Sequence, residues 1–92
     1  MRKLSWTPKS IRNFKRLIRQ NPRLRQEIDR ALQQLVVEPS HSSLRTHKLK
    51  GDLADTWACS IDYSYRILFK SVQDQEEESI LLINIGTHDD VY

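Results

Sequence analysis

The first half of the chain carries apolar residues at helical spacing. Thr7-Pro8 marks the start of a first helix, because threonine caps free backbone amides and proline at the first helical position loses no required hydrogen bond. Asn21-Pro22 repeats this signal, and a second apolar stripe ends before Pro39. The pattern predicts two helices joined as an αα-hairpin over residues 8–37. Its apolar positions are Ile11, Phe14, Leu17, Ile18, Leu24, Ile28, Ala31, Leu32 and Leu35.

Apolar and polar residues alternate on either side of the hairpin, as they do in strands with one buried face. In residues 57–62 the odd positions are apolar and the even ones are small or polar. The acidic residues 74–78 favour a solvated turn, and the run after them is apolar on both faces, which is typical of a strand inside a sheet. The expected strands are residues 3–6, 44–49, 57–62, 65–70 and 79–85.

These elements predict an α+β fold in the order β-α-α-β-β-β-β. We expect one domain over residues 1–92, with residues 3–6 and 44–86 in a mostly antiparallel sheet and the helical hairpin packed on one face. The other face of the sheet is expected to be open. With 92 residues the chain is too short for a two-domain enzyme. The side chains expected to face the helices include Tyr65, Ile67 and Phe69.

The charge is unevenly distributed, although the net charge is only +3. Residues 1–50 hold 13 Lys and Arg against 3 Asp and Glu, a net charge of +10. Residues 51–92 hold 2 against 9, a net charge of −7. Such an asymmetry indicates a polyanion or an acidic protein as the partner.

Several classes of protein are excluded by composition. The single Cys59 has no partner for an internal disulfide, and one Cys with three scattered His gives no metal-ligand spacing, so we expect no metal and a reducing, cytoplasmic setting. Two glycines, Gly51 and Gly86, make no phosphate-binding loop, so no nucleotide cofactor is expected. The N-terminal residues lack the apolar stretch of a signal peptide, and no run is long and apolar enough to span a membrane.

Three residues suggest chemistry on the open face of the sheet. Arg66 lies mid-strand among apolar neighbours and offers bidentate donors to a phosphate. His88 follows the last strand and His47 lies near the first strand after the helices, and histidine accepts and donates protons near neutral pH. Metal-free RNA cleavage needs this set: a base for the 2′-hydroxyl, an acid for the leaving 5′-oxygen, and positive charge at phosphorus.

Each of these residues also has a structural interpretation. Arg66 with nearby Asp62 is typical of a surface ion pair, which contributes about 0 to 1 kcal/mol. His47 alone is typical of a solvated strand end, and His88 of a turn residue held by the carboxylates that follow it. The basic helix face alone is compatible with a solubilising surface.

Three motifs in order resemble a known pattern. They are His47-Lys48-Leu49-Lys50-Gly51, Tyr65-Arg66-Ile67-Leu68-Phe69 and the terminal Gly86-Thr87-His88-Asp89-Asp90-Val91-Tyr92. Together with the basic hairpin, they resemble the RelE/ParE superfamily of type II toxins, and within it the RelE and YafQ-like branch. The resemblance covers almost the whole chain. It implies a toxin that cleaves mRNA, typically in the ribosomal A site, and is held inactive by an acidic antitoxin encoded in the same operon.

The resemblance also implies roles for individual residues. Arg66 matches the arginine that stabilises the transition-state phosphate, His88 the histidine assigned to proton transfer, and Tyr92 the aromatic that positions the substrate base. Ser60 stands where YafQ-like proteins carry a further histidine, so the general base is open between His47 and Asp62. The residues expected to contact RNA are Arg45, Lys48, Lys50 and Tyr65.

Two other functions remain as alternatives. One is a ParE-like inhibitor of DNA gyrase without ribonuclease activity, which His47 and the Gly86-Thr87-His88 ending disfavour. The other is a non-toxic relative whose only activity is to pair with its antitoxin.

Overall fold

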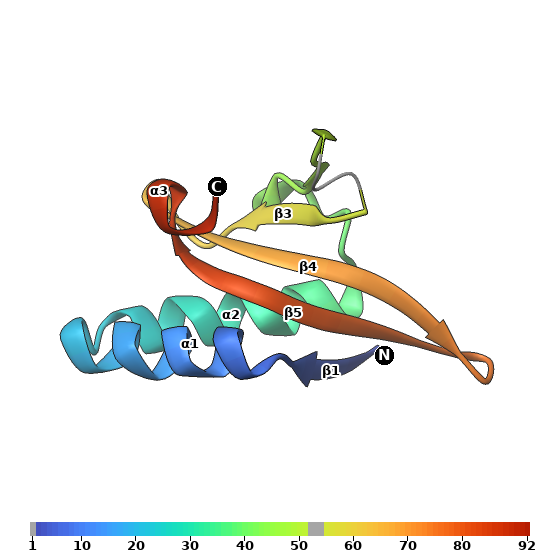
Figure 1. Cartoon of the computed structure of the whole chain (residues 1–92), viewed down its shortest axis with the longest axis horizontal. Coiled ribbons are helices and arrows are strands. Elements are labelled where there is room, and N and C mark those ends of the chain that lie inside the picture. The colour runs from blue at the N-terminus through green and yellow to red at the C-terminus, as the bar shows by residue number, and fades with distance from the viewer. Residues whose placement is uncertain (1, 52–54) are drawn as a thin grey trace.

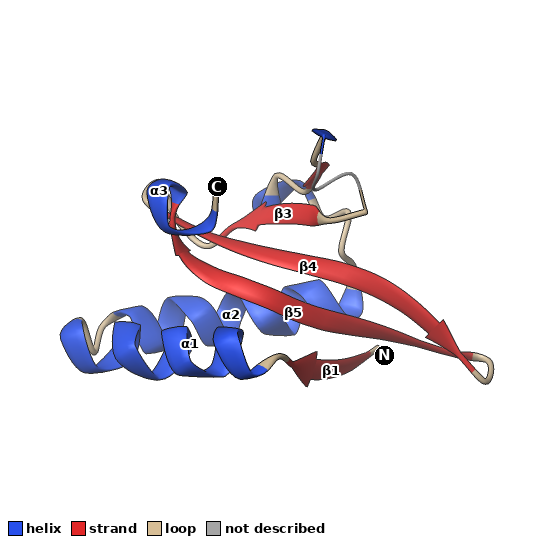
Figure 2. Ribbon diagram, viewed as in Figure 1, coloured by secondary structure: helices blue, strands red, loops and turns tan. Residues whose placement is uncertain are grey.

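A twisted five-stranded sheet forms the middle of the molecule in the computed structural model, which describes residues 2–51 and 55–92. Two long helices lie along one side of the sheet, and a short C-terminal helix lies on its other side at one end (Figure 1). Figure 2 shows the same elements coloured by type. In chain order the elements are β1 (Lys3–Trp6), α1 (Pro8–Gln20), α2 (Leu24–Val37), the 3-10 helix η1 (Ser42–Leu44), β2 (His47–Lys48), β3 (Trp57–Ser60), β4 (Tyr65–Asp74), β5 (Glu77–Thr87) and α3 (His88–Val91).

The strands are arranged in the order β1-β5-β4-β3-β2. β1 runs parallel to β5, and all other neighbours are antiparallel. The predicted α+β fold with a mostly antiparallel sheet is therefore confirmed, and β5 lies inside the sheet as expected. Phe69 pairs with Leu82 and Leu68 with Asn84, so Ile83 is the extra residue of a β-bulge in β5.

The helical hairpin begins as the sequence predicts. The hydroxyl of Thr7 accepts a hydrogen bond from the amide of Ser10 at 3.1 Å and so caps α1. The second helix differs from the prediction, because Asn21 ends α1 instead of capping α2: its amide donates to the carbonyl of Leu17 at 2.8 Å. α2 then begins at Leu24, without a side-chain cap.

The main core lies between the hairpin and the sheet. It contains buried residues from both helices and from the helix-facing side of β3, β4 and β5, and Trp6, Trp57 and Tyr65 pack against it. A second, smaller cluster lies on the opposite face, where Val91 of α3 packs against Ala58 and Leu68. The prediction of an open second face is therefore wrong in part, because α3 covers some of it.

The predicted strand at residues 44–49 is shorter than expected. Leu44 belongs to η1 and is buried, and Arg45 ends that helix with a left-handed backbone, φ +50°. Only His47 and Lys48 then pair with β3. Residues 52–54, which the prediction included in the sheet segment 44–86, and residue 1 lie outside the described residues.

Two loop boundaries also differ from the prediction. β3 ends at Ser60 and not at Asp62, because the Asp62 side chain accepts hydrogen bonds from the next backbone amides and bends the chain. The acidic turn is reduced to Gln75 and Glu76, whose φ values of +47° and +71° match a two-residue hairpin turn. The remaining acidic residues of the predicted turn belong to the paired strands β4 and β5.

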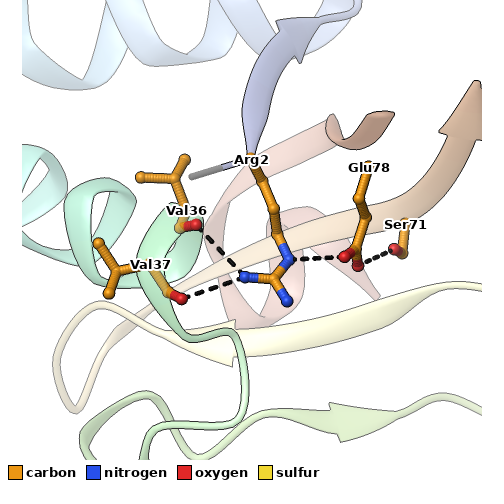
Figure 3. A network of polar contacts seen from close by, with 5 residues as sticks. All are labelled: Arg2, Val36, Val37, Ser71 and Glu78. Carbon is orange, nitrogen blue, oxygen red and sulfur yellow. Dashed lines mark hydrogen bonds and ion pairs between the residues drawn. The ribbon is translucent and has the colours of Figure 1, made fainter. Parts of the chain in front are cut away.

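A network of polar contacts joins the N-terminus to β5 and to the end of α2 (Figure 3). The Arg2 guanidinium forms an ion pair with Glu78 at 3.0 Å, and it donates to the carbonyls of Val36 and Val37 at 3.4 and 3.1 Å. The hydroxyl of Ser71 donates to the same carboxylate at 2.9 Å. The network therefore joins the start of the chain to the start of β5 and to the C-terminal end of α2.

We expect Glu78→Gln to lower the free energy of unfolding at neutral pH and to lose this effect in acid. Hydrogen bonding to Arg2 and Ser71 holds the pKa of Glu78 below its ordinary value of 4.5. The ionised carboxylate thus stabilises the fold above that ordinary value, and the contribution is lost as the pH falls through the lowered folded pKa. Urea unfolding at neutral pH and at about pH 3 measures the difference.

The matched control for this experiment is Glu76→Gln, which changes an exposed carboxylate in the neighbouring turn. A difference between wild type and Glu78→Gln that stays as large in acid as at neutral pH would contradict the prediction.

Candidate functional site

The face of the sheet opposite the hairpin carries Arg66. Side chains alternate along a strand, and Leu68 lies in the small cluster under α3, so Arg66 points to that same face two residues earlier. The register places Ser60 of β3 and Gly86 of β5 on either side of it. Arg66 therefore lies on the middle one of three paired strands, next to the end of β5 where α3 begins.

Arg66 is held by backbone carbonyls of the bend that precedes it. Its Nη1 donates to the carbonyl oxygens of Asp62, Tyr63 and Tyr65 at 2.8, 3.1 and 3.1 Å. The Asp62 carboxylate is used differently, because its Oδ1 accepts from the amides of Ser64 and Tyr65, both at 2.8 Å. Within the described residues, Arg66 and Asp62 thus contact through the Asp62 backbone and form no ion pair.

Three of the predicted site residues line one groove. It has a volume of about 320 Å³ and joins Arg66 and Asp62 to Arg45, a residue that is 21 positions earlier in the chain. Arg45 adopts a left-handed backbone, which is unfavourable for a non-glycine residue and recurs at functional sites. The full lining is Ser43, Arg45, Ser60, Ile61, Asp62, Tyr63 and Arg66.

Tyr63 is a groove residue that lies between the strands expected at residues 57–62 and 65–70, and it was not among the predicted site residues. Its side chain is 95% exposed, beside the carbonyl that holds Arg66. An aromatic ring left in water at the rim of a basic groove is suited to stack on a nucleic-acid base. The available signal was an aromatic residue between Asp62 and Ser64, where turn chemistry favours small polar residues.

His88 and Tyr92 form an exposed pair at the C-terminus. Their ring centroids are 4.4 Å apart with a tilt of 48°. His88 Nδ1 lies 3.8 Å from a carboxylate oxygen of Asp89. Arg66 pairs with Gly86, and the preceding residue, Tyr65, pairs with Thr87. His88 follows directly after Thr87. The pair therefore lies at the same end of the sheet as the arginine groove but does not line it.

A capping box fixes the start of α3. The amide of Asp90 donates to the Thr87 hydroxyl at 3.3 Å, and the amide of Thr87 donates to Asp90 Oδ2 at 3.1 Å. Hydrogen bonding to Thr87 lowers the pKa of the Asp90 carboxyl. This helix was not among the predicted elements, although the Thr-x-x-Asp spacing is a local signal for it.

Asn84 connects α3 to the rest of the fold. It is buried inside the apolar run of β5, where a polar side chain needs partners. Its Oδ1 accepts from Asn13 of α1 at 2.6 Å and from the amide of Ile85 at 2.9 Å, and its Nδ2 donates to the carbonyl of Asp90 at 3.4 Å. This residue was also missed, although one polar residue among apolar neighbours was its signal.

The other predicted site residues are more dispersed. His47 pairs with Ala58 and so shares the face of Arg66, and its Nδ1 lies 3.1 Å from the carbonyl of Arg45. Lys48 pairs with Trp57 and Tyr65 packs against the main core, so both lie on the hairpin side of the sheet. Lys50 is exposed beyond β2. Strand register thus places His47 on the same face as Arg66, and Lys48 and Tyr65 on the opposite face.

Other kinds of chemistry find little support in the described part of the chain. No three His, Cys, Asp or Glu side chains among residues 2–51 and 55–92 lie close enough together to hold a metal ion. Burial raises the pKa of the Cys59 thiol to about 12, so it carries no reactive thiolate at neutral pH. None of the described helices has the length and apolar character needed to cross a membrane.

A helical hairpin on one face of a five-stranded sheet, with the first strand parallel to the last, is the RelE-like α+β fold that the sequence indicated. The sequence matches, over residues 4–92, the family model described as "ParE toxin of type II toxin-antitoxin system, parDE". The chain therefore belongs to this family of type II toxins, within the RelE/ParE superfamily. No curated protein sequence is similar enough to match.

Solved structures share the fold at low sequence identity. The "YoeB/ParE toxin from Agrobacterium tumefaciens" is 23% identical with a TM-score of 0.81, and the alignment covers 94% of this chain and 98% of that one. YafQ from E. coli strain BL21(DE3) is 11% identical with a TM-score of 0.81 and coverages of 100% and 99%. A chain of the E. coli DinJ-YafQ toxin-antitoxin complex is 13% identical with a TM-score of 0.79 and coverages of 99% and 97%.

We expect Gly86→Ala to displace α3. A Cβ atom at this position would stand 2.7 Å from Asp90 Cβ and 3.0 Å from its Oδ2, closer than side chains approach. Overpacking of this kind costs about 1 to 3 kcal/mol. Urea unfolding measures the loss, and the imidazole NMR signals of His88 report the displacement.

Gly51→Ala is the control for the His88 signals, because no atom beyond its two chain neighbours lies within 4 Å of the added Cβ. Its φ of +71° is strained, so it should lose some stability while the His88 signals stay unchanged. Unchanged His88 signals in Gly86→Ala would show that α3 does not depend on this close approach.

Proposed function

We propose that this toxin is an endoribonuclease of the RelE and YafQ-like branch, which cleaves mRNA in the ribosomal A site by acid–base attack of the 2′-hydroxyl and so inhibits translation. The observation that carries the proposal is the position of Arg66: it shares a groove with Arg45 and lies at the same end of the sheet as the His88–Tyr92 pair. The likeness to YafQ supports the same branch.

Arg66 is suited to bind the scissile phosphate. A guanidinium has five N–H donors, and the hydrogen bonds to the bend use Nη1 alone. The nitrogens Nε and Nη2 are thus left for two phosphate oxygens, which is the bidentate geometry that arginine prefers. Positive charge held in place before the reaction stabilises the extra negative charge of the transition state.

His47 is the better of the two candidates for the general base. If Nδ1 carries the proton and donates to the Arg45 carbonyl, Nε2 keeps a lone pair that can take the 2′-hydroxyl proton. Asp62 is less suited, because its Oδ1 already accepts two amide hydrogen bonds. His88 then protonates the leaving 5′-oxygen, which yields a 2′,3′-cyclic phosphate and a 5′-hydroxyl.

The RNA follows the basic groove. Arg45 lines it beside Arg66, and Tyr63 stands exposed at its rim. Lys50 extends the positive charge beyond β2, whereas Lys48 and Tyr65 lie on the other side of the sheet and take no part in this groove. Tyr92 holds His88 by ring contact and positions the substrate base. Contacts of this kind to the RNA backbone weaken as salt increases.

An acidic antitoxin encoded beside the toxin is the expected protein partner. A complex with an antitoxin is known for YafQ, in the DinJ-YafQ structure. In this chain α1 carries five basic residues and no acidic residue, so an acidic segment would find complementary charge there. The outer strands β1 and β2 each pair on one side only and offer edges to an added strand.

We expect Arg66→Ala and His88→Ala to abolish growth arrest and to slow mRNA cleavage on translating ribosomes. Loss of the phosphate ligand removes about 10²- to 10³-fold of the rate, and loss of the proton donor about 10²- to 10⁴-fold. Primer extension on a defined mRNA measures both effects. Arg25→Ala, which removes an exposed charge from α2, is the control and should cleave at the wild-type rate. Full toxicity of both site variants would refute the assignment.

We expect Tyr63→Ala to weaken RNA binding and Tyr63→Phe to preserve it, because the ring stacks on a base. Loss of one stacked base costs about 1 to 3 kcal/mol, or roughly 5- to 150-fold in Kd. Fluorescence anisotropy in a His88→Ala background measures affinity without cleavage. The side chain is almost wholly exposed, so neither variant should change the unfolding midpoint. Equal affinity of the two variants would exclude stacking.

The second candidate function is inhibition of DNA gyrase without RNA cleavage. The observation that favours it is the match to the ParE family model over nearly the whole chain. A supercoiling assay with purified gyrase separates the two functions. Loss of supercoiling with intact mRNA would establish the gyrase inhibitor and refute the ribonuclease.

A further inference from the structure

One polar side chain links the helices on the two sides of the sheet. Asn84 of β5 is 4% exposed, and its Nδ2 donates to the carbonyl of Asp90 in α3 at 3.4 Å. Its Oδ1 accepts from Nδ2 of Asn13 in α1 at 2.6 Å. α1 and α3 lie on opposite sides of this end of β5 (Figure 1). One buried amide therefore joins the helical hairpin to the short helix that begins with His88.

The edge of the sheet explains how a single side chain reaches both helices. β1 pairs with β5 as far as Leu82, and α1 begins shortly after β1 ends. The amide of Thr7 donates to the Leu82 carbonyl at 3.1 Å, and its hydroxyl donates to the carbonyl of the bulged residue Ile83 at 3.2 Å. Asn84 follows this attachment directly, where α1 takes the place of β1 beside the strand.

α3 needs contacts of this kind because it is a single turn of four residues. A helix this short does not keep its shape or direction in water by itself. The capping box stabilises the turn, and Val91 packs against the small cluster. The Asp90 carbonyl is one of the groups that a helix leaves unbonded at its C-terminal end, and Asn84 provides its donor. The direction of α3, and with it that of the His88 imidazole, therefore depends on Asn84.

The two ends of the Asn84 amide are not interchangeable. Its oxygen faces two donors, the side-chain amide of Asn13 and the backbone amide of Ile85 at 2.9 Å. Its nitrogen faces an acceptor, the Asp90 carbonyl. A flip of the amide would place nitrogen against the backbone donor and oxygen against the carbonyl oxygen. The bond from Asn13 therefore helps to keep the amide in the orientation that supports α3.

We propose that Asn84 and Asn13 are positioning residues for His88: Asn13 orients the buried Asn84 amide, which holds α3 and thereby places the imidazole near the end of the Arg66 groove. Their role in catalysis rests on the proposed RNA cleavage, in which His88 protonates the leaving oxygen. Neither asparagine lines the groove, so both act through α3 and not on the substrate. Substrate binding in the groove should therefore not depend on them.

The test changes Asn13, because this residue is only half-buried and tolerates substitution better than Asn84. Asn13→Asp has nearly the same shape, but its carboxylate offers no donor and repels the Asn84 oxygen. Asn13→Gln keeps an amide donor and is the conservative variant. Gln20→Ala, which removes an exposed amide group from the same helix, is the matched control.

The NMR signals of the His88 imidazole are recorded at a temperature at which every variant is fully folded, and RNA cleavage is measured on the same proteins. In Asn13→Asp the His88 signals should shift, and kcat should fall about 2- to 10-fold with little change in KM, the equivalent of one lost hydrogen bond. Asn13→Gln should restore both, and Gln20→Ala should match wild type. A residue that only stabilised the fold would lower the unfolding midpoint without these changes.

A second comparison tests whether the effect passes through Asn84. Asn84→Ala should shift the His88 signals by itself, because it removes the bond to the Asp90 carbonyl. In that background Asn13→Asp should cause no further shift, since the amide on which it acts is gone. A direct electrostatic effect of the new carboxylate on the imidazole would persist there, and equal shifts with and without Asn84 would refute the coupling.

The outcomes separate this role from the proposed ribonuclease function. If the His88 signals of Asn13→Asp match those of Gln20→Ala, the positioning role is wrong, whatever the activity. If they shift but wild type cleaves no RNA, the two asparagines place His88 as proposed and the ribonuclease function fails. If they shift while kcat keeps its wild-type value, these residues do not position His88 for the reaction and the proposal is overturned. If Asn84→Ala does not fold, the Asn13 variants alone decide.

Discussion

The antiparallel pairing of β4 with β5 is the constraint on which the rest of the structure depends. It is the longest pairing in the sheet, and one face of it carries Ile67 and Ile85 into the main core. The same register places Arg66 opposite Gly86, two residues before His88. Burial of one face against the hairpin therefore determines which polar side chains meet on the other. A slip of one residue would turn Arg66 into the core, so the core protects the geometry of the candidate site.

The uneven charge of the chain has two different uses. Part of the acidic excess stabilises the fold locally, because Glu77 and Glu78 pair with Lys3 and Arg2 at the far end of the sheet. The ion pairs join the N-terminal residues to the start of β5, where opposite charges meet through the parallel pairing of β1 with β5. The basic residues of α1 have no such partners among the described residues, so their charge stays available for the proposed contacts with RNA or an acidic antitoxin.

The bend between β3 and β4 changes the interpretation of Asp62. From the sequence it was a candidate base or an ion-pair partner, but its carboxylate organises backbone amides. Arg66 in turn is oriented by carbonyl dipoles, which hold it without neutralising its charge. A positive group that is held in place without an ion-pair partner among the described residues is suited to an incoming phosphate, because its charge is not neutralised.

The helical hairpin over residues 8–37, the α+β class and most of the residues that face the core were predictable, because apolar spacing and helix caps act within a turn or two of the chain. Ile11 of the predicted apolar stripe is the exception, since it is 39% exposed and lies outside the core. The Thr87 capping box was equally local and was overlooked. The sequence alone did not determine that Arg45 joins Arg66 in one groove, that α3 covers part of the open face, or that Lys48 turns away from the site. These placements depend on strand register, a left-handed residue and side chains that capture distant backbone groups. Tertiary packing decides them, because residues far apart in sequence compete for the same partners and only the whole fold selects among them.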